Sequence, residues 1–254
     1  MPLRVSRPEL PDPDLRAHLV RAFPNALLLL GDGSAPLLPH TSFWVAGDNG
    51  AVVGVAALFR GFEMPVLSLI STDPETAREL IDRPRESAAP ESLLALYGGE
   101  PALAADWAAS ETQEDVWMTR ATAPSIETTA IEITSADELS SFYRKHQMRF
   151  WASAMHQFGH CFGFRGHSGE LVSAAAVNFI IPEVAYAQIG GVVTDPAWRG
   201  KGFARSCVLA VIDSLYRSGI AECGLFARCD DGRLLEFYCS LGFRERGRFH
   251  FIGL

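Results

Sequence analysis

The residues best suited to chemistry form the stretch RGKGFAR, residues 199–205, directly before an apolar run with helical spacing. The start of a helix exposes unpaired backbone N–H groups and carries roughly half a positive charge. Gly200 and Gly202 lack a side chain, so an anion such as a diphosphate can approach the backbone closely. The residues expected to surround this anion are Arg199, Gly200, Lys201, Gly202, Phe203, Ala204 and Arg205.

Two familiar phosphate motifs do not describe this loop. A P-loop requires G-x-x-x-x-G-K-[ST], which does not occur in the chain, and GKGFAR lacks the third glycine of a dinucleotide fingerprint. The alternative is an ordinary turn between a strand and a helix, in which the glycines only ease the bend.

The elements around the loop follow from the apolar pattern of the second half. The run VAYAQIGGVVT predicts a strand before the loop, and the following helix should end at Gly219. Earlier, Ser135 and Glu138 form a capping box that opens a helix. Later, Asp231 is expected to cap the last helix, which lies between two further strands.

The first half contains its own strand and turn signals. Asn49-Gly50, between two β-rich runs, predicts a hairpin, and residues 64–71 predict a third strand. Residues 91–97 are a helix candidate. The segment ATAPSIETT is the best candidate for a boundary, so we expect an N-terminal domain over 1–125 and a second domain over 126–254.

The two halves also align with each other without a gap. Thr72-Asp73-Pro74 lies 122 residues before Thr194-Asp195-Pro196, and two apolar strands precede each copy. The same offset sets Arg78 opposite Gly200 and Leu80 opposite Gly202, so a repeated first half would have lost the phosphate loop. Chance similarity between two β-β-α stretches is the alternative.

Residues 128 to 254 resemble the GNAT (GCN5-related N-acetyltransferase) superfamily. The resemblance rests on the family pattern Q/R-x-x-G-x-G/A, met by Arg199, Gly202 and Ala204, on the strand QIGGVVT before it, and on LEFYCSLGF near the end. It implies an α/β fold with a mixed, mostly antiparallel sheet flanked by helices. If the repeat is real, the N-terminal domain is a second, degenerate copy.

The resemblance also implies acetyl-CoA as co-substrate and a set of site residues. Two strands should splay apart, with backbone groups near Val192 and Val193 holding the pantetheine beside a bulge at Gly190 and Gly191. Tyr238 stands where the family has a tyrosine that protonates the departing thiolate, and a phenol with a pKa near 10 suits that task. Packing on the sheet is the alternative role for Tyr238.

The general base is the point at which this sequence departs from the family. The position of the catalytic glutamate in histone-acetylating relatives falls on Tyr186, which cannot act as a base at neutral pH. Glu183 is a candidate, although a glutamate at a hairpin end is usually only solvated. A water chain past Tyr186 and Gln188 could serve instead, or the amine could arrive neutral.

Composition limits the partners. The 254 residues carry a net charge of −8 without charge runs, which argues against nucleic acid or an anionic membrane as a partner. The chain shows neither a signal peptide nor a membrane span, so we expect a cytoplasmic protein, monomeric or homodimeric. The five cysteines lack a CxxC pair and should be reduced thiols, and His156 with His160 lacks a third ligand, so no metal is expected.

The resulting hypothesis is an acetyl-CoA-dependent N-acetyltransferase. Its second half is expected to transfer an acetyl group to the amine of a small or amino-acid-like molecule, while the first half shapes the acceptor pocket or packs as a partner domain. Two alternatives remain, which are an N-acyltransferase that uses a longer acyl-CoA and a non-catalytic, CoA-binding regulatory domain.

Overall fold

The structure is a computed structural model that describes residues 4–85, 93–97, 112–123 and 128–253. By packing, the chain divides into two compact units, Met1–Val116 with Gly247–Leu254, and Trp117–Arg246. The predicted boundary at 125 and 126 lies outside the described residues and stays a prediction. Residues 117–123 pack with the second unit, and residues 247–253 pack with the first.

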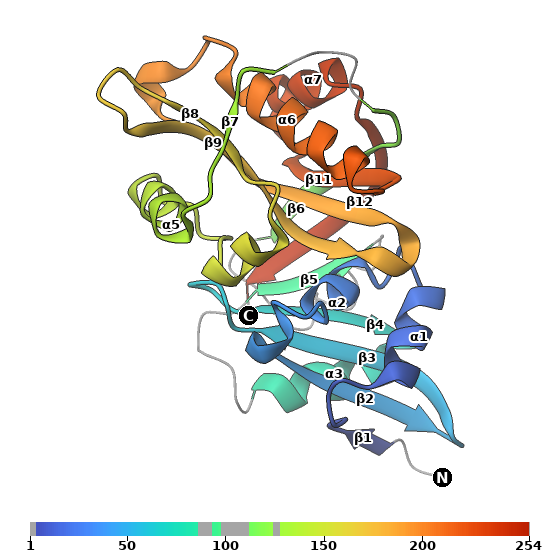
Figure 1. Ribbon diagram of the computed structural model, residues 1–254. Helices are drawn as coiled ribbons and strands as arrows, with labels where there is room; N and C mark the ends of the chain where they lie inside the picture. The colour runs from blue at the N-terminus through green and yellow to red at the C-terminus, as the bar shows by residue number, and fades with distance from the viewer. Residues whose placement is uncertain (1–3, 86–92, 98–111, 124–127, 254) are drawn as a thin grey trace. The chain divides into compact units, whose positions relative to one another are not determined.

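The first unit is a sheet in the order β1-β2-β3-β4-β5, to which the C-terminal part of β12 adds beside β5 (Figure 1). The β4–β5 pair is parallel, and the other pairs of that series are antiparallel. Its elements are β1 (Arg4–Ser6), α1 (Pro13–Arg21), α2 (Leu27–Asp32), the 3₁₀ turn η1 (Leu38–His40), β2 (Thr41–Asp48), β3 (Ala51–Phe59), β4 (Val66–Ser71), α3 (Pro74–Arg85), β5 (Leu93–Tyr97) and β6 (Thr112–Arg120), which continues into the second unit.

Local sequence signals explain several of these elements. Asn49 and Gly50 both have positive φ angles, 49° and 84°, as the predicted two-residue hairpin turn requires. Asp12 caps α1 by accepting hydrogen bonds from the backbone N–H groups of Asp14 and Leu15. The predicted helix over 91–97 is wrong for the described part of that range, because Leu93–Tyr97 is strand β5.

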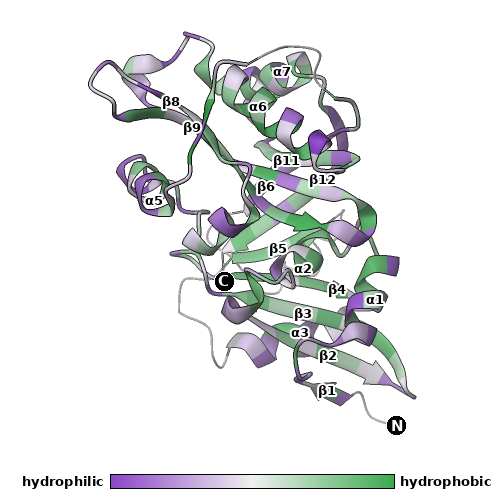
Figure 2. Ribbon diagram, in the orientation of Figure 1, coloured by the Kyte–Doolittle hydropathy of each residue, from purple (hydrophilic) through white to green (hydrophobic). Residues whose placement is uncertain are grey.

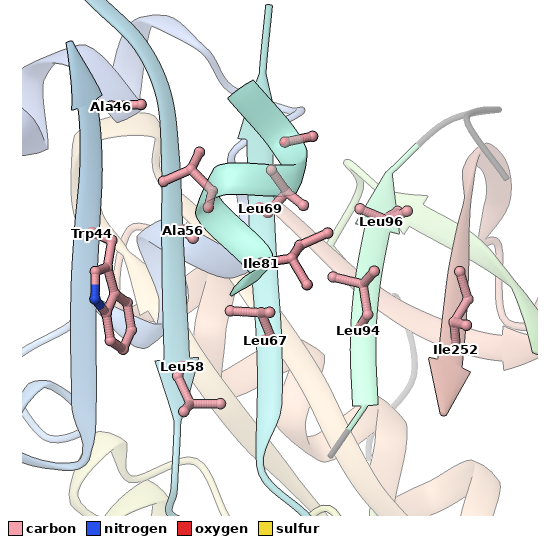
Figure 3. Packing of buried hydrophobic residues seen from close by; sticks show 12 residues of the cluster. Trp44, Ala46, Ala56, Leu58, Leu67, Leu69, Ile81, Leu94, Leu96 and Ile252 are labelled. Carbon is pink, nitrogen blue, oxygen red and sulfur yellow. The ribbon is translucent and has the colours of Figure 1, made fainter. Parts of the chain in front are cut away.

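One cluster of the core of the first unit lies between the sheet and α3. Apolar residues follow one another along β3 and β4 in Figure 2, and Figure 3 shows Ile81 of α3 directed toward the strands. Ile252 of β12 belongs to the same buried cluster and is 1% exposed, so the last strand of the chain completes the core of the first unit.

The second unit repeats this order of elements. Its strands run β11-β10-β9-β8-β7, with β6 beside β11; β10 and β11 are parallel, and the pairs from β10 to β7 are antiparallel. The elements are β7 (Ile131–Glu132), α5 (Ala136–Lys145), η3 (Ser153–Phe158), β8 (Phe162–Arg165), β9 (Leu171–Ile181), η4 (Pro182–Val184), β10 (Tyr186–Thr194), η5 (Pro196–Trp198), α6 (Phe203–Arg217), β11 (Glu222–Arg228), α7 (Gly232–Ser240) and β12 (Arg244–Gly253).

The predicted fold class is therefore confirmed, a mixed and mostly antiparallel sheet flanked by helices with the same strand order in each half. The N-cap predictions hold, since Ser135 accepts from the N–H of Glu138 at 3.2 Å and Asp231 accepts from the N–H of Leu234 at 3.0 Å, but of the predicted capping box only the Ser135 half is formed. Glu138 itself pairs with Arg165.

Candidate active site

The loop between β10 and α6 is open at both of its glycines. Gly200 and Gly202 have φ angles of 76° and 80°, a conformation that glycine adopts without strain. A Cβ atom at either position would meet no described atom within 4 Å. Gly202 is the N-cap of α6 and has no side chain to accept from the first N–H groups of the helix. The start of α6 can therefore receive an anion.

A cavity of about 850 Å³ lies against this loop, within the second unit. Its walls are the end of α5, the end of β10, the loop with the first turn of α6, and one side of α7. The predicted site residues that line it are Val192, Val193, Arg199, Gly200, Gly202, Phe203, Ala204, Arg205 and Tyr238. One cavity thus brings the anion loop and the predicted proton donor together, and their functional roles remain predictions.

Two predicted residues lie elsewhere. Lys201 is outside the described set that lines the cavity, and its Nζ atom lies 4.4 Å from the centre of the Trp198 ring, in a cation–π contact. Glu183 is exposed in η4, before the first residue of β10, whereas the cavity is lined by the last residues of that strand. Glu183 is therefore not among the described residues that line the cavity.

The strands β10 and β11 separate in front of the cavity. Tyr186, Ala187 and Gln188 lie opposite residues of β11, and their pairing ends there although both strands continue. The expected splay is thus present.

The predicted bulge in β10 is also present. Gly190 lies opposite Ala176 and Val193 opposite Ala174, so two residues of β10, Gly191 and Val192, face a single residue of β9. The hydroxyl of Tyr143 on α5 donates a hydrogen bond to the carbonyl oxygen of Gly191 at 2.7 Å and is buried. We had not singled out Tyr143 from the sequence, because only the fold brings α5 onto the bulge.

This contact gives a stability prediction. We expect Gly191→Ala to lower the free energy of unfolding by about 2–5 kcal/mol, since its φ of 58° is strained for alanine and the new Cβ would lie 2.4 Å from the buried Tyr143 hydroxyl. Gly200→Ala is the control, because it carries the same kind of strain without a described neighbour within 4 Å, and should cost about 1–2 kcal/mol. Urea unfolding would measure both, and equal losses would contradict the role given to Tyr143.

Tyr238 is held at the cavity wall by α7. The side chain is 5% exposed, and its ring centre lies 5.9 Å from that of Phe243 in an edge-to-face contact. Burial raises the pKa of the Tyr238 phenol above its usual value, so the group keeps its proton at neutral pH. A protonated phenol can donate to a thiolate in the cavity.

Tyr186 belongs to a buried hydrogen-bond chain. Its hydroxyl accepts from Trp117 Nε1 at 2.8 Å and donates to Gln188 Oε1. Burial raises the pKa of Tyr186 well above its usual value, which agrees with its predicted unfitness as a base. Gln188 Nε2 has no hydrogen-bond partner within the described residues.

Sequence reasoning missed three lining residues at the end of α5, namely Lys145, His146 and Gln147. Lys145 Nζ lies 3.0 Å from Asp195 Oδ2, and His146 Nε2 lies 3.5 Å from the same oxygen. Basic residues in a last helical turn commonly interact with the helix dipole, so their types alone did not mark a site.

Other side chains have structural partners. Within the described residues no group of three or more His, Cys, Asp or Glu side chains could hold a metal ion. His156 Nε2 lies 3.0 Å from the Ile133 carbonyl oxygen, and His160 Nδ1 lies 2.8 Å from Ser214 Oγ. All five cysteines are free.

In the part of the chain that the structure describes, none of the helices is both long and apolar enough to cross a membrane.

Comparison with known proteins agrees with this geometry. Residues 126–243 match the model of the acetyltransferase (GNAT) family. No curated protein matches the sequence of the chain.

Solved structures resemble the chain over nearly its whole length. A tandem GNAT protein from the clavulanic acid biosynthesis pathway is 17% identical, with 100% of this chain and 98% of that chain covered and a TM-score of 0.67. A GCN5-related N-acetyltransferase from Sphaerobacter thermophilus is 16% identical, with 99% and 95% covered and a TM-score of 0.64. An acetyltransferase from Colwellia psychrerythraea is 13% identical, with 99% of each chain covered and a TM-score of 0.58. These likenesses establish the fold alone.

Proposed function

Since residues 126–243 match the model of the acetyltransferase (GNAT) family, we propose that this chain transfers an acetyl group from acetyl-CoA to the amine of a small or amino-acid-like molecule. The observation that carries the proposal is the cavity whose walls include both an uncapped helix start and a buried, protonated tyrosine. The proposed route is direct attack of the amine on the thioester, without an acetylated protein side chain.

The residues of the cavity fit coenzyme A. The diphosphate of coenzyme A needs N–H donors, positive charge and space for a close approach to the backbone. The open glycines of the loop leave that space at the N–H groups, and Arg199 and Arg205 supply the positive charge. The described residues that line the cavity include neither an aspartate nor a glutamate. This composition favours a polyanionic ligand.

Two groups of the chain would act on the reacting atoms. Acetyl-CoA supplies the activated acetyl thioester. The backbone near Val192 and Val193 would hold the pantetheine arm and place the thioester carbonyl near a fixed N–H donor, which stabilises the developing negative charge. The Tyr238 phenol would then give its proton to the departing thiolate. Burial raises the pKa of this phenol, so the phenol keeps its proton until the thiolate forms.

Release of free thiol tests the proposal. The purified chain should release coenzyme A from acetyl-CoA faster when glycine, ethanolamine or glucosamine is added than without an amine. A chain that binds acetyl-CoA but releases no thiol with any amine would favour the non-catalytic, CoA-binding alternative. Equal rates with acetyl-CoA and longer acyl-CoA esters would favour the wider acyltransferase.

The first half has no equivalent of the open loop. Its helix α3 begins at Pro74, directly after the TDP corner, and the carboxylate of Asp73 accepts from the N–H of Thr76 at 2.8 Å. Hydrogen bonds, chiefly this one, lower the pKa of Asp73, so a negative charge already occupies the helix start. Leu80, aligned with Gly202, is fully buried in α3. In the described residues between β4 and α3 there is therefore no open glycine loop.

We therefore expect one CoA site per chain. A calorimetric titration of the full chain with coenzyme A should give a stoichiometry of one, because the Asp73 carboxylate would repel a diphosphate from the start of α3. A stoichiometry of two would show that the first half also binds the cofactor and would contradict this account.

A further inference from the structure

A histidine that lines the cavity lies close to a carboxylate that does not line it. His146 Nε2 lies 3.5 Å from Asp195 Oδ2 and has no hydrogen-bond partner among the described residues. The His146 side chain is 12% exposed, but its Nε2 atom is buried. The exposed surface therefore belongs to other atoms of the side chain. His146 lines the cavity, and because Nε2 is buried, Nδ1 is the ring nitrogen through which it would act on a ligand there.

The surroundings of His146 keep the imidazole neutral. Burial lowers its pKa below 6.5, and nearby Lys145 and Arg199 lower it further, while Asp195 acts in the opposite direction. The ring also lies against Phe142, with 4.6 Å between the ring centres. A group whose folded pKa is below 6.5 is deprotonated at pH 7 and can accept a proton.

Asp195 is placed to stabilise the charge that would then form. Hydrogen bonds from Lys145 and from the N–H of Ala197 lower its pKa, so it is ionised at neutral pH. Imidazolium formed at His146 would lie 3.5 Å from this carboxylate.

No other residue in the described lining of the cavity combines these properties. Lys145, Arg199 and Arg205 are cationic side chains, and burial holds Tyr238 protonated. The candidates from the sequence do not serve either, since Glu183 lies away from the cavity wall and the Tyr186 hydroxyl is engaged in the buried chain.

We infer that His146 is the general base that takes the proton from the acceptor ammonium, with Asp195 as its positioning residue. The inference rests on the proposed function. The ammonium proton moves to imidazole, and the neutral amine nitrogen forms its bond to the acetyl carbon as the carbon–sulfur bond breaks. The thiolate takes a proton from Tyr238, the second proton that the acylated nitrogen must lose restores the Tyr238 phenol, and the proton held by His146 passes to solvent, so that one proton is released per acetyl group transferred.

The pH dependence of kcat/KM tests this role. His146→Gln should lower thiol release about 10²–10⁴-fold at pH 7, the range of general base catalysis. The loss should shrink to less than tenfold at a pH above the pKa of the amine, because the acceptor then arrives neutral. A loss of the same size at every pH would make His146 a structural residue and overturn the inference.

His160→Gln is the matched control. His160 also has a pKa lowered mainly by burial, yet it bonds to Ser214 and lies outside the described residues that line the cavity. Its variant should keep the wild-type pH profile. A change of profile equal to that of His146→Gln would show a general effect of removing a buried histidine, which would also overturn the inference.

A second measurement does not depend on turnover. In an NMR titration of the full chain, His146 should titrate below pH 6.5, and Asp195→Asn should move its pKa lower still, because the carboxylate favours imidazolium. A value above 7 in the wild type would contradict the role of His146 as a base. Absence of thiol release by the wild type with every amine, together with the expected titration, would instead refute the proposed function.

Discussion

Gly202→Asp is expected to abolish binding of coenzyme A while leaving the chain folded. Gly202 is the N-cap of α6, and the new side chain would enter the open space from which the diphosphate must approach. Its carboxylate would also bring a negative charge to the positive end of the helix, where it would compete with the ligand for the same N–H groups. Calorimetry should show no measurable binding.

Gly219→Asp is the control for this variant. Gly219 follows the other end of the same helix, has a similar φ of 93°, and also has no described atom within 4 Å of a new Cβ. The two variants therefore share charge and backbone strain and differ in their distance from the loop. If both kept the wild-type affinity, the loop would have no part in binding coenzyme A.

Tyr238→Phe is expected to lower kcat by a factor of about 10² or more, with little change in the affinity for acetyl-CoA. The variant keeps the ring that packs on Phe243 and removes the proton that the leaving thiolate needs. An interaction made only in the transition state affects kcat and leaves ground-state binding intact. Stopped-flow thiol release and calorimetry would separate the two quantities.

Tyr216→Phe provides the comparison. The hydroxyl of Tyr216 donates to the Arg120 carbonyl oxygen at 3.1 Å, and the residue lies outside the described set that lines the cavity. Removing this hydroxyl should change the free energy of unfolding more than it changes kcat. Nearly normal kcat in Tyr238→Phe would make Tyr238 a packing residue.

The loop and the caps could be read from the sequence because their causes are local. A glycine with a positive φ, such as Gly202, or a carboxylate three residues before the N–H that it caps, such as Asp231, depends on a few neighbouring residues. The bulge at Gly191 was predictable for the same reason, since glycine tolerates the irregular backbone of such a position.

Strand β5 shows where this local reasoning fails. The run Leu93–Tyr97 is too short and too uniformly apolar for its period to distinguish a helix from a strand. Its conformation is set by pairing with β4 on one side and with β12 on the other, which comes from the end of the chain. Sequence neighbours carry no information about either partner.

The candidate base was missed for a related reason. His146 ends a helix and Asp195 follows a strand, and only the fold sets them 3.5 Å apart. Counting back from Arg199 led to Tyr186, and Glu183 was considered because it lies just before the same strand. Both choices assume that the base lies on or next to that strand, as in other members. The structure offers a different element, α5, at the same cavity.

Transfer of the acetyl group itself is the most direct test of the account. The chain would be incubated with acetyl-CoA that carries a ¹³C-labelled acetyl group and with a pool of small amines, and the products would be analysed by mass spectrometry. The account predicts a labelled N-acetyl product that forms with the wild type and is strongly reduced with Tyr238→Phe. Binding of coenzyme A without any labelled product would contradict it and would leave the chain as a protein that binds the cofactor without using it.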